Sequence, residues 1–338
     1  MTRTIVIAPQ WIGDAVMSEP LLRQLSERGD QLTVAALPWV APVYRAIVPM
    51  PEIIELPFAH GRLDLSARRR IAATWRGRFD CALVLPNSIK SALLPWLADI
   101  PLRIGYRGEG RWLLLNRQLP NPSGRPPMVD FYSALAGTSA SGATVAPVSP
   151  RLSFSDDELG DALRAAGLER EGYWVFAPGA EYGPAKRWPA TRYSELARSL
   201  QDSDALPVVL LGSAGEASLC NAIAAAAPGA CRVLAGQVPL LDAMKIIAGA
   251  RGVVSNDSGL MHVAAAFGVP QVAVFGSTSP EHTPPLSHRA QVIWLKRELG
   301  LACMPCFDRT CRFGHTLCLN EIDVSRVEGA LATALATE

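Results

Sequence analysis

The sequence has little of several features that would assign a function class at once. Its 338 residues contain four lysines, no apolar stretch long enough to cross a bilayer, and a formal net charge of +1. This near balance of charge argues against a protein that binds polyanions through its bulk charge. The absence of a membrane span, with a start that leads directly into an apolar strand, predicts a cytoplasmic protein.

Two nucleotide-associated motifs are also missing from their usual places. The first apolar strand is not followed by G-x-G-x-x-G, which disfavours a nicotinamide oxidoreductase. Asp202-Ser203-Asp204 has the D-x-D pattern of many metal-dependent sugar-nucleotide enzymes, but it precedes its strand. We therefore interpret it as a solvated turn.

Cysteine is not scarce, but it is concentrated near the end of the chain. Four of the seven cysteines form the series Cys303-x2-Cys306-x4-Cys311-x6-Cys318, which encloses His315. The spacing allows a structural zinc site, yet it lacks the paired C-x2-C arrangement of common zinc ribbons. A thiol-rich loop or a labile disulfide is the alternative.

Apolar runs of strand type alternate with helical stretches along the chain, which predicts parallel α/β sheets. The expected strands are residues 4–8, 32–36, 53–56, 81–85, 102–104, 173–177, 208–211, 233–234, 252–254, 271–275 and 291–295. The length favours two hydrophobic cores, and we expect one architecture built twice. We predict domains at 1–168 and 169–322, followed by a helix at 323–338 that packs back on the first domain.

A polar turn after the apolar run 252–254 is the most informative feature that is present. Ser255-Asn256-Asp257-Ser258-Gly259 ends a buried strand and opens directly into a helix that carries His262. The free N–H groups and the positive dipole end of such a helix form an anion site. We predict that a diphosphate binds here, with His262 as a ligand contact.

A second strand-to-helix turn contains Asp14, directly after Gly13. Asp is a good helix N-cap, which is one interpretation. The surrounding Pro9, Trp11 and Gly13 favour the other, in which a carboxylate acts as general base toward a sugar hydroxyl.

The Gly- and Pro-rich loop 178–189 ends in two adjacent cations, Lys186 and Arg187. A lysine there suits a diphosphate, whereas a solvated loop end is the alternative. Glu216, which follows the Gly212-Ser213 turn, could accept hydrogen bonds from a ribose or could simply start a helix. Arginines of the first half form either a solvated face or a surface for an anionic acceptor, with interleaved tryptophans that could meet a membrane.

Four segments together resemble the ADP-heptose:lipopolysaccharide heptosyltransferases of glycosyltransferase family 9, and its type II members most. They are residues 5–14, 85–92, 178–189 and 256–262, which occur in the same order in the family. The resemblance implies a GT-B fold of two facing Rossmann-like domains, with the acceptor in the first and ADP-heptose in the second. It also implies inverting transfer of heptose to the first heptose of the inner core, Hep-Kdo2-lipid A.

The resemblance assigns the general base to Asp14 and neutralisation of the diphosphate to Lys186. We expect donor contacts from Gly179, Glu181, Tyr182, Lys186, Gly212, Ser213, Glu216, Asp257, Ser258, Gly259 and His262. We expect acceptor contacts from Gly13, Arg62, Asn87, Ser88, Lys90 and Arg107. The expected protein is a monomer that needs no cofactor and touches the inner face of the inner membrane. The alternatives are heptosyltransferase I activity, another nucleotide-sugar transferase, or a silent protein that binds lipopolysaccharide precursors.

Overall fold

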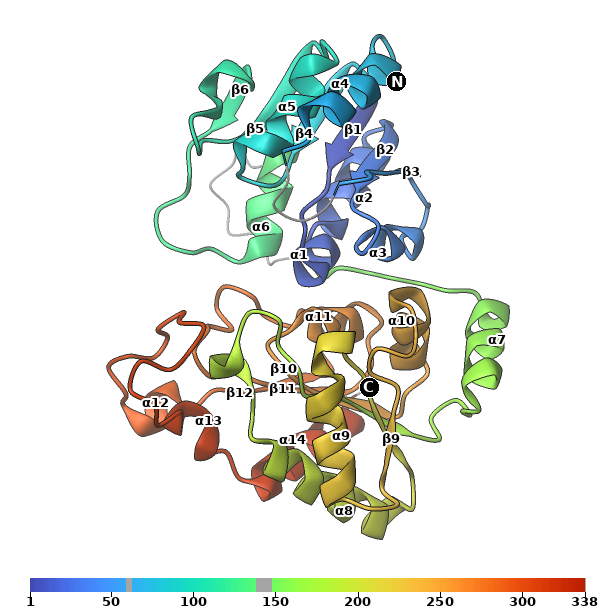
Figure 1. Cartoon of the computed structure of the whole chain (residues 1–338), viewed down its shortest axis with the longest axis vertical. Coiled ribbons are helices and arrows are strands. Elements are labelled where there is room, and N and C mark those ends of the chain that lie inside the picture. Colours follow the sequence, from blue (N-terminus) through green and yellow to red (C-terminus); the bar gives the residue numbers. More distant parts are fainter. Residues whose placement is uncertain (59–62, 138–147, 338) are drawn as a thin grey trace. The chain divides into compact units, whose positions relative to one another are not determined.

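The structure is a computed structural model, which describes residues 1–58, 63–137 and 148–337 (Figure 1). The chain divides into two compact units, Met1–Ser153 and Phe154–Glu338. Each unit contains one six-stranded sheet in which every neighbouring pair of strands is parallel. The predicted α/β class and the duplicated architecture are confirmed.

The first unit alternates strands and helices from its start. Its elements are β1 (Arg3–Ile7), α1 (Ile12–Met17), α2 (Glu19–Glu27), β2 (Gln31–Ala36), α3 (Ala41–Arg45), β3 (Glu52–Glu55), α4 (Leu65–Trp75), β4 (Cys81–Val84), α5 (Ile89–Leu97), β5 (Leu102–Tyr106), η1 (Arg111–Leu113), β6 (Arg117–Leu119), α6 (Met128–Ser133) and η2 (Ala134–Ala136). The strand order is β3-β2-β1-β4-β5-β6. The direction of winding therefore reverses between β1 and β4, and in such sheets ligands bind beyond the carboxyl ends of the strands at that point.

The second unit repeats the same order with different residues. Its elements are α7 (Asp156–Ala166), β7 (Trp174–Ala177), η3 (Pro184–Lys186), α8 (Ala190–Asp204), β8 (Val208–Leu210), η4 (Ala214–Glu216), α9 (Ala217–Ala226), β9 (Cys231–Val233), α10 (Leu240–Ala248), β10 (Gly252–Asn256), α11 (Gly259–Ala266), β11 (Gln271–Val274), β12 (Ala290–Ile293), α12 (Lys296–Leu299), α13 (Leu317–Asn320) and α14 (Val324–Ala336). The order β12-β11-β10-β7-β8-β9 puts the switch point between β7 and β10. The loop with Lys186 follows β7, and Asp257 follows β10.

The boundary between the units differs from the predicted one, which placed it after residue 168. Ser155 caps α7 through a capping box with Glu158, as the sequence indicates, but α7 packs against α10 in the second unit. Its buried face consists of Leu159 and Leu163. A strong helix start can therefore open a domain as well as close one.

The C-terminal helix α14 also belongs to the second unit, where it contacts β11, β12 and α8. Val327 and Leu331 are buried in the core that Trp174, Phe176 and Trp188 dominate. The second sheet therefore covers the apolar face of α14, in place of the expected packing on the first domain. The core of the first unit is separate and surrounds Trp75.

Candidate functional site

The turn at the end of β10 has the predicted geometry. Ser258 is the N-cap of α11, with an extended backbone, and the buried helix begins at Gly259. The Ser258 hydroxyl makes no cap bond, and it is buried without a hydrogen-bond partner among the residues that the structure describes. A buried hydroxyl without a partner is unfavourable, so a hydrogen bond from this position would be stabilising.

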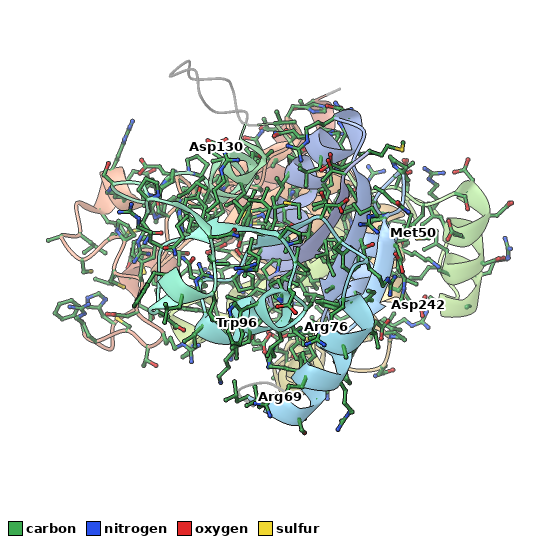
Figure 2. All side chains as sticks on the ribbon, turned by 90° about the horizontal axis from the view of Figure 1, so that it is seen from above. Met50, Arg69, Arg76, Trp96, Asp130 and Asp242 are labelled. Carbon is green, nitrogen blue, oxygen red and sulfur yellow. The ribbon has the colours of Figure 1, made fainter. Side chains whose placement is uncertain are left out.

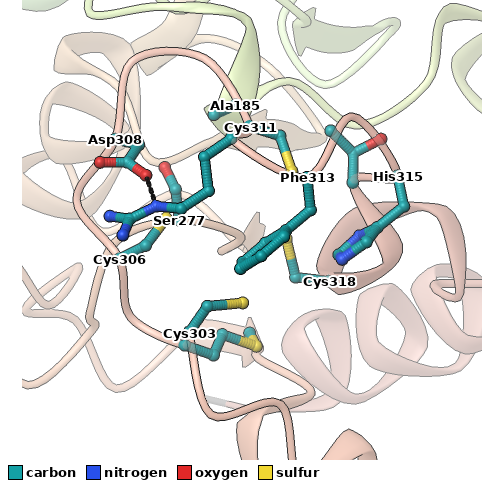
Figure 3. A pocket seen from close by; sticks show the side chains of 12 residues that line it. Ala185, Ser277, Cys303, Cys306, Asp308, Cys311, Phe313, His315 and Cys318 are labelled. Carbon is teal, nitrogen blue, oxygen red and sulfur yellow. Dashed lines mark hydrogen bonds and ion pairs between the residues drawn. The ribbon is translucent and has the colours of Figure 1, made fainter.

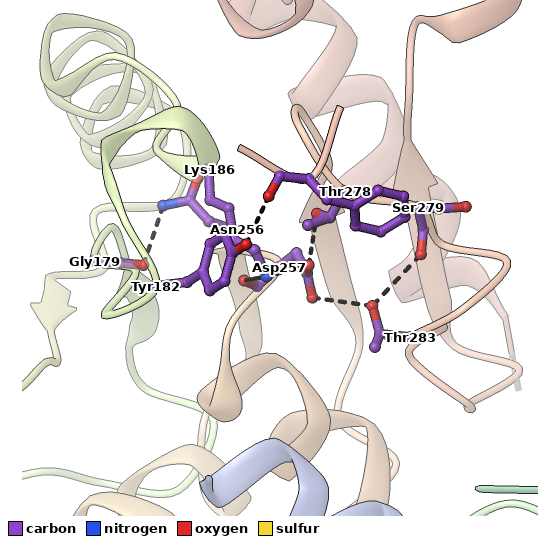
Figure 4. A network of polar contacts seen from close by, with 9 residues as sticks. Gly179, Tyr182, Lys186, Asn256, Asp257, Thr278, Ser279 and Thr283 are labelled. Atoms are coloured by element: carbon purple, nitrogen blue, oxygen red, sulfur yellow. Dashed lines mark hydrogen bonds and ion pairs between the residues drawn. The ribbon is translucent and has the colours of Figure 1, made fainter. Parts of the chain in front are cut away.

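Asp257 and Lys186 form a buried ion pair at the switch point of the second sheet (Figure 4). Lys186 Nζ lies 2.6 Å from Asp257 Oδ2, and the two side chains are 14% and 5% exposed. The hydroxyls of Thr278 and Thr283 also donate to this carboxylate, at 2.6 and 3.4 Å. The Asp257 carboxylate therefore accepts from three side-chain donors, and one of these contacts holds Lys186 in place.

Asn256 is a residue that holds the candidate site together and that the expected contacts did not include. Its amide nitrogen donates to the Pro178 carbonyl at 2.7 Å, and its amide oxygen accepts from Trp188 N at 2.9 Å and from Tyr193 Oη at 3.2 Å. Asn256 thus ties both ends of the 178–188 loop to β10. The only sequence signal was an amide residue at the end of a buried strand.

His262 lies on the buried side of α11. Burial lowers the pKa of His262, Asp257 opposes this shift and Lys186 adds to it, and the resulting pKa is about 4. The imidazole is therefore neutral near pH 7. A neutral ring suits a contact with a ligand better than proton donation, which agrees with the sequence interpretation.

Glu216 closes a capping box, because its Oε2 accepts from Ser213 N at 2.8 Å. The helix-start interpretation of Glu216 is therefore observed. Its carboxylate also lies over two glycines, since a Cβ added to Gly179 would come 1.9 Å from Oε1 and one added to Gly212 would come 3.0 Å from Oε2. The two glycines, Gly179 above all, leave the space that the Glu216 carboxylate occupies.

Tyr182 points toward Lys186, whose Nζ lies 5.1 Å from the centre of the ring (Figure 4). The Tyr182 hydroxyl donates to the Phe307 carbonyl at 2.6 Å. Glu181, the neighbouring candidate, is exposed. The structure thus joins Lys186, Tyr182 and Asp257 around one point, with Glu181 at the rim.

Asp14 is not the cap of its helix, because Trp11 occupies the N-cap of α1 and Asp14 is the third helical residue. Its Oδ1 accepts from the hydroxyl of buried Tyr132 at 3.0 Å. Burial, together with the charge of Asp14 and this hydrogen bond, raises the pKa of Tyr132 well above its ordinary value. Tyr132 therefore stays protonated and holds the carboxylate in place, while Gly13 is buried beside it.

The residues after β4 line a cavity of about 310 Å³ in the first unit. Ser88 caps α5, and Lys90 and Gln10 are also in the lining. Arg68 reaches the same cavity although it is only 6% exposed, because its guanidinium lies 4.0 Å from the Phe58 ring centre and donates to the Lys90 carbonyl at 3.0 Å. Sequence reasoning had counted Arg68 only as one member of an arginine run.

The other acceptor candidates are less well supported. Asn87 is fixed by buried Arg111, which donates to Asn87 Oδ1 at 2.8 Å and to the Pro86 carbonyl at 2.5 Å. Arg107 is exposed and is not in the lining of the cavity. Arg62 lies outside the described residues.

The clustered cysteines come together, as Figure 3 shows. Cys303, Cys306, Cys311 and Cys318 are free thiols that line one small cavity of about 20 Å³ together with His315. No three His, Cys, Asp or Glu side chains in the described ranges are arranged to hold a metal ion.

Asp202 and Asp204 of the D-x-D pattern lie in the last turn of α8, and Asp204 is 3.7 Å from Arg251. In the same ranges, no helix is both long and apolar enough to span a membrane.

Comparisons with known proteins agree with this geometry. The sequence profile of glycosyltransferase family 9 (heptosyltransferase) matches residues 68–317. Lipopolysaccharide heptosyltransferase 2 of Escherichia coli K12 is 42% identical over 307 residues, which cover 87% of this chain and 88% of that protein. Lipooligosaccharide heptosyltransferase 2 of Haemophilus influenzae is 38% identical over 305 residues, with 86% and 88% covered. The solved structure of E. coli ADP-heptose lps heptosyltransferase II matches with a TM-score of 0.86 at 38% identity, over 98% of both chains.

Two doubly wound units that match the solved structure of E. coli heptosyltransferase II over 98% of both chains identify a glycosyltransferase of GT-B architecture. The fold class and the enzyme class expected from the sequence are confirmed. Within that class, the extent of the matches decides the family: the chain belongs to glycosyltransferase family 9.

Proposed function

We propose that this protein transfers L-glycero-D-manno-heptose from ADP-heptose to the first heptose of the lipopolysaccharide inner core, with inversion at the anomeric carbon. The names of its relatives, which are heptosyltransferases 2, support this acceptor. The observation that carries the proposal is the Lys186–Asp257 pair beside the first turn of α11. This arrangement presents a fixed cation and free backbone N–H groups to a departing diphosphate.

On the donor side, the diphosphate is assigned to Lys186, the Ser258 hydroxyl and the N–H groups that begin at Gly259. Asp257 acts by orienting Lys186, and neutral His262 is assigned to the same turn. The ribose is assigned to Glu216, whose carboxylate lies over Gly179 and Gly212 next to Ser213. Tyr182 and Glu181 complete the rim.

On the acceptor side, Asp14 is the general base. The acceptor hydroxyl attacks the anomeric carbon of the donor, a new C–O bond forms, and the bond from that carbon to the ADP oxygen breaks. The hydroxyl proton passes to the Asp14 carboxylate, and ADP leaves against the charge of Lys186. Tyr132 positions the carboxylate by donating to Oδ1 at 3.0 Å.

The cavity after β4 is the proposed place for the acceptor, with Gly13, Asn87, Ser88 and Lys90 as contacts. Two cations, Arg68 and Lys90, and one carboxylate, Glu109, are the charged residues of its lining, so its net charge is positive and suits an acidic sugar core. Arg62 and Arg107 stay in the proposal as contacts with more distant parts of the acceptor.

A peripheral contact with the inner membrane surface follows from the acceptor, which is a lipid. Arg69 on α4, Arg76 directly after α4 and Trp96 on α5 are exposed (Figure 2), and α4 packs against α5. Exposed arginines with an exposed tryptophan suit an anionic bilayer surface. We propose a cytoplasmic monomer that meets the membrane in this way and needs no metal or other cofactor for transfer.

Transfer to defined acceptors tests the proposal against its alternatives. Wild-type protein with ADP-heptose should add one heptose to Hep-Kdo2-lipid A and none to Kdo2-lipid A, as read by mass spectrometry of the acceptor, with the same rate in EDTA. Transfer to Kdo2-lipid A would instead indicate heptosyltransferase I activity. Binding of both substrates without transfer would indicate a silent binding protein, and transfer from another nucleotide sugar alone would change the donor.

A further inference from the structure

The segment 301–318, which we call the cysteine loop, makes hydrogen bonds to the loop that carries Lys186 and to the turn after β11. The Arg309 carbonyl accepts from Ala185 N at 3.1 Å, directly before Lys186. The Phe307 carbonyl accepts from the Tyr182 hydroxyl, and Phe307 N donates to the Ser277 carbonyl at 2.7 Å. The cysteine loop therefore fixes the loop that carries Lys186 and the turn that precedes Thr278.

Gly183 shows how closely the two loops approach. A Cβ added at Gly183 would lie 2.3 Å from the Arg309 carbonyl oxygen, and backbone atoms cannot move aside as a flexible side chain can. Glycine is therefore required where the cysteine loop meets the donor loop. The contact is built into the sequence on both sides.

The side chain of Arg309 brings a second cation to Tyr182. Its guanidinium carbon lies 5.2 Å from the centre of the Tyr182 ring, and Lys186 Nζ lies 5.1 Å from the same centre. Arg309 is exposed, and it forms no ion pair with any residue in the described part of the chain. Cation–π contacts of this kind leave the outer guanidinium N–H groups available to a ligand.

The charge at the donor turn makes such a cation useful. Asp257 compensates Lys186 through a 2.6 Å ion pair, so the pair as a whole adds no net charge. The two phosphate groups of a nucleotide diphosphate bring negative charge that the helix dipole offsets only in part. An unpaired arginine offers planar, charge-assisted hydrogen bonds to phosphate oxygens.

We propose that Arg309 binds the diphosphate of the donor as a second cation beside Lys186, and that the cysteine loop exists to hold it there. The inference rests on the proposed donor, a nucleoside diphosphate sugar. It gives the cysteine-rich segment, which the shared chemistry leaves unexplained, a role in donor affinity. A purely structural role, in which Arg309 only stacks on Tyr182, is the alternative.

Calorimetric titration of the full-length protein with ADP and with AMP separates these roles. Arg309→Gln should weaken ADP binding roughly tenfold, equivalent to about 1.4 kcal/mol, and should change AMP binding by less than about twofold. Arg309→Lys, which keeps the charge, should recover part of the loss. Arg312→Gln is the matched control, because Arg312 lies on the same loop, is exposed, and pairs with Asp308 at 2.6 Å; it should bind ADP as the wild type does.

Unchanged ADP binding by Arg309→Gln would overturn the inference, and so would equal weakening of ADP and AMP, since a disturbed loop would affect both. The inference and the proposed function fail separately. If Arg309→Gln shows the ADP-specific loss of affinity but the wild-type protein transfers no heptose, the inference about Arg309 stands and the proposed transferase activity is refuted.

Discussion

The ion pair between Lys186 and Asp257 should contribute to stability as well as to function, and Asp257→Asn tests this. The substitution keeps the shape of the side chain and an oxygen for Thr278, so it removes little except the negative charge. Because the two side chains are 14% and 5% exposed, it leaves a largely buried ammonium without compensation. Breaking one partner of a buried pair typically costs about 3–5 kcal/mol.

Since Asn still accepts a hydrogen bond, we expect the low end of this range, a loss of about 3 kcal/mol in the unfolding free energy of the second unit. Urea unfolding followed by tryptophan fluorescence measures it, because Trp174 and Trp188 are buried in that unit. Lys186→Met in both backgrounds completes a double-mutant cycle, for which we expect a coupling of about 2–3 kcal/mol. ADP at saturating concentration should stabilise Asp257→Asn more than wild type, since the ADP phosphates compensate the charge of Lys186 that the substitution leaves unpaired.

The bidentate pair of Arg326 and Glu298 is a matched control in the same unit. Both distances are 2.5 Å, but the side chains are 45% and 52% exposed, so a coupling below about 1 kcal/mol is expected. A coupling for Lys186 and Asp257 as small as that of the control pair would refute the reasoning. Equal stabilisation of wild type and Asp257→Asn by ADP would also contradict it.

Two further predictions concern the cysteine loop. Gly183→Ala should destabilise the second unit by about 1–3 kcal/mol and weaken ADP binding, because the added Cβ would lie 2.3 Å from the Arg309 carbonyl oxygen. Gly229→Ala controls for backbone strain alone, because Gly229 has a φ of +82° and an added Cβ would meet no atom within 4 Å. An ADP affinity unchanged by Gly183→Ala would refute the link between this contact and donor binding. Backbone hydrogen bonds, the largest effect coming from Thr316, lower the pKa of Cys311. Burial and then the neighbouring thiols raise the pKa of Cys318 to about 11. Iodoacetamide near pH 7 should therefore label Cys311 first, and it should label Cys318 only as the pH approaches 11. Peptide mass spectrometry reads the order, and equal labelling of the two at neutral pH would contradict the assignment.

Much of the fold could be predicted because buried parallel strands are read directly as apolar runs. The strand that the sequence did not indicate is β6, whose Arg117, Gln118 and Leu119 lie at the edge of the first sheet and are only partly covered. The boundary was misplaced because the capping box at Ser155 marks a helix start without showing which core α7 covers. That information lies in the long-range contact with α10.

The local geometry of the candidate site was predictable where a single turn forms it, as at Ser258 and Gly259, where a buried strand leads into a helix. It was less predictable where function depends on distant partners: Asp257 meets Lys186 across 71 positions, and Asp14 meets Tyr132 across 118. Arg68 and Arg111 were not predictable for the same reason, because a series of arginines in the sequence does not show which guanidinium groups are buried. We therefore propose that Asp257, which the sequence predicts as a donor contact, also positions Lys186.

The central claim is tested most directly by the turnover of Asp14→Asn with ADP-heptose and Hep-Kdo2-lipid A, measured beside donor affinity. Loss of the base should lower kcat by about 10²–10⁴-fold and leave the Kd for ADP within about twofold of wild type. Asp80→Asn is the matched control, since Asp80 pairs with Arg3 at 2.6 Å before β4, away from the carboxyl ends of the strands, and it should keep wild-type turnover. Turnover by Asp14→Asn within a few fold of wild type would contradict the account.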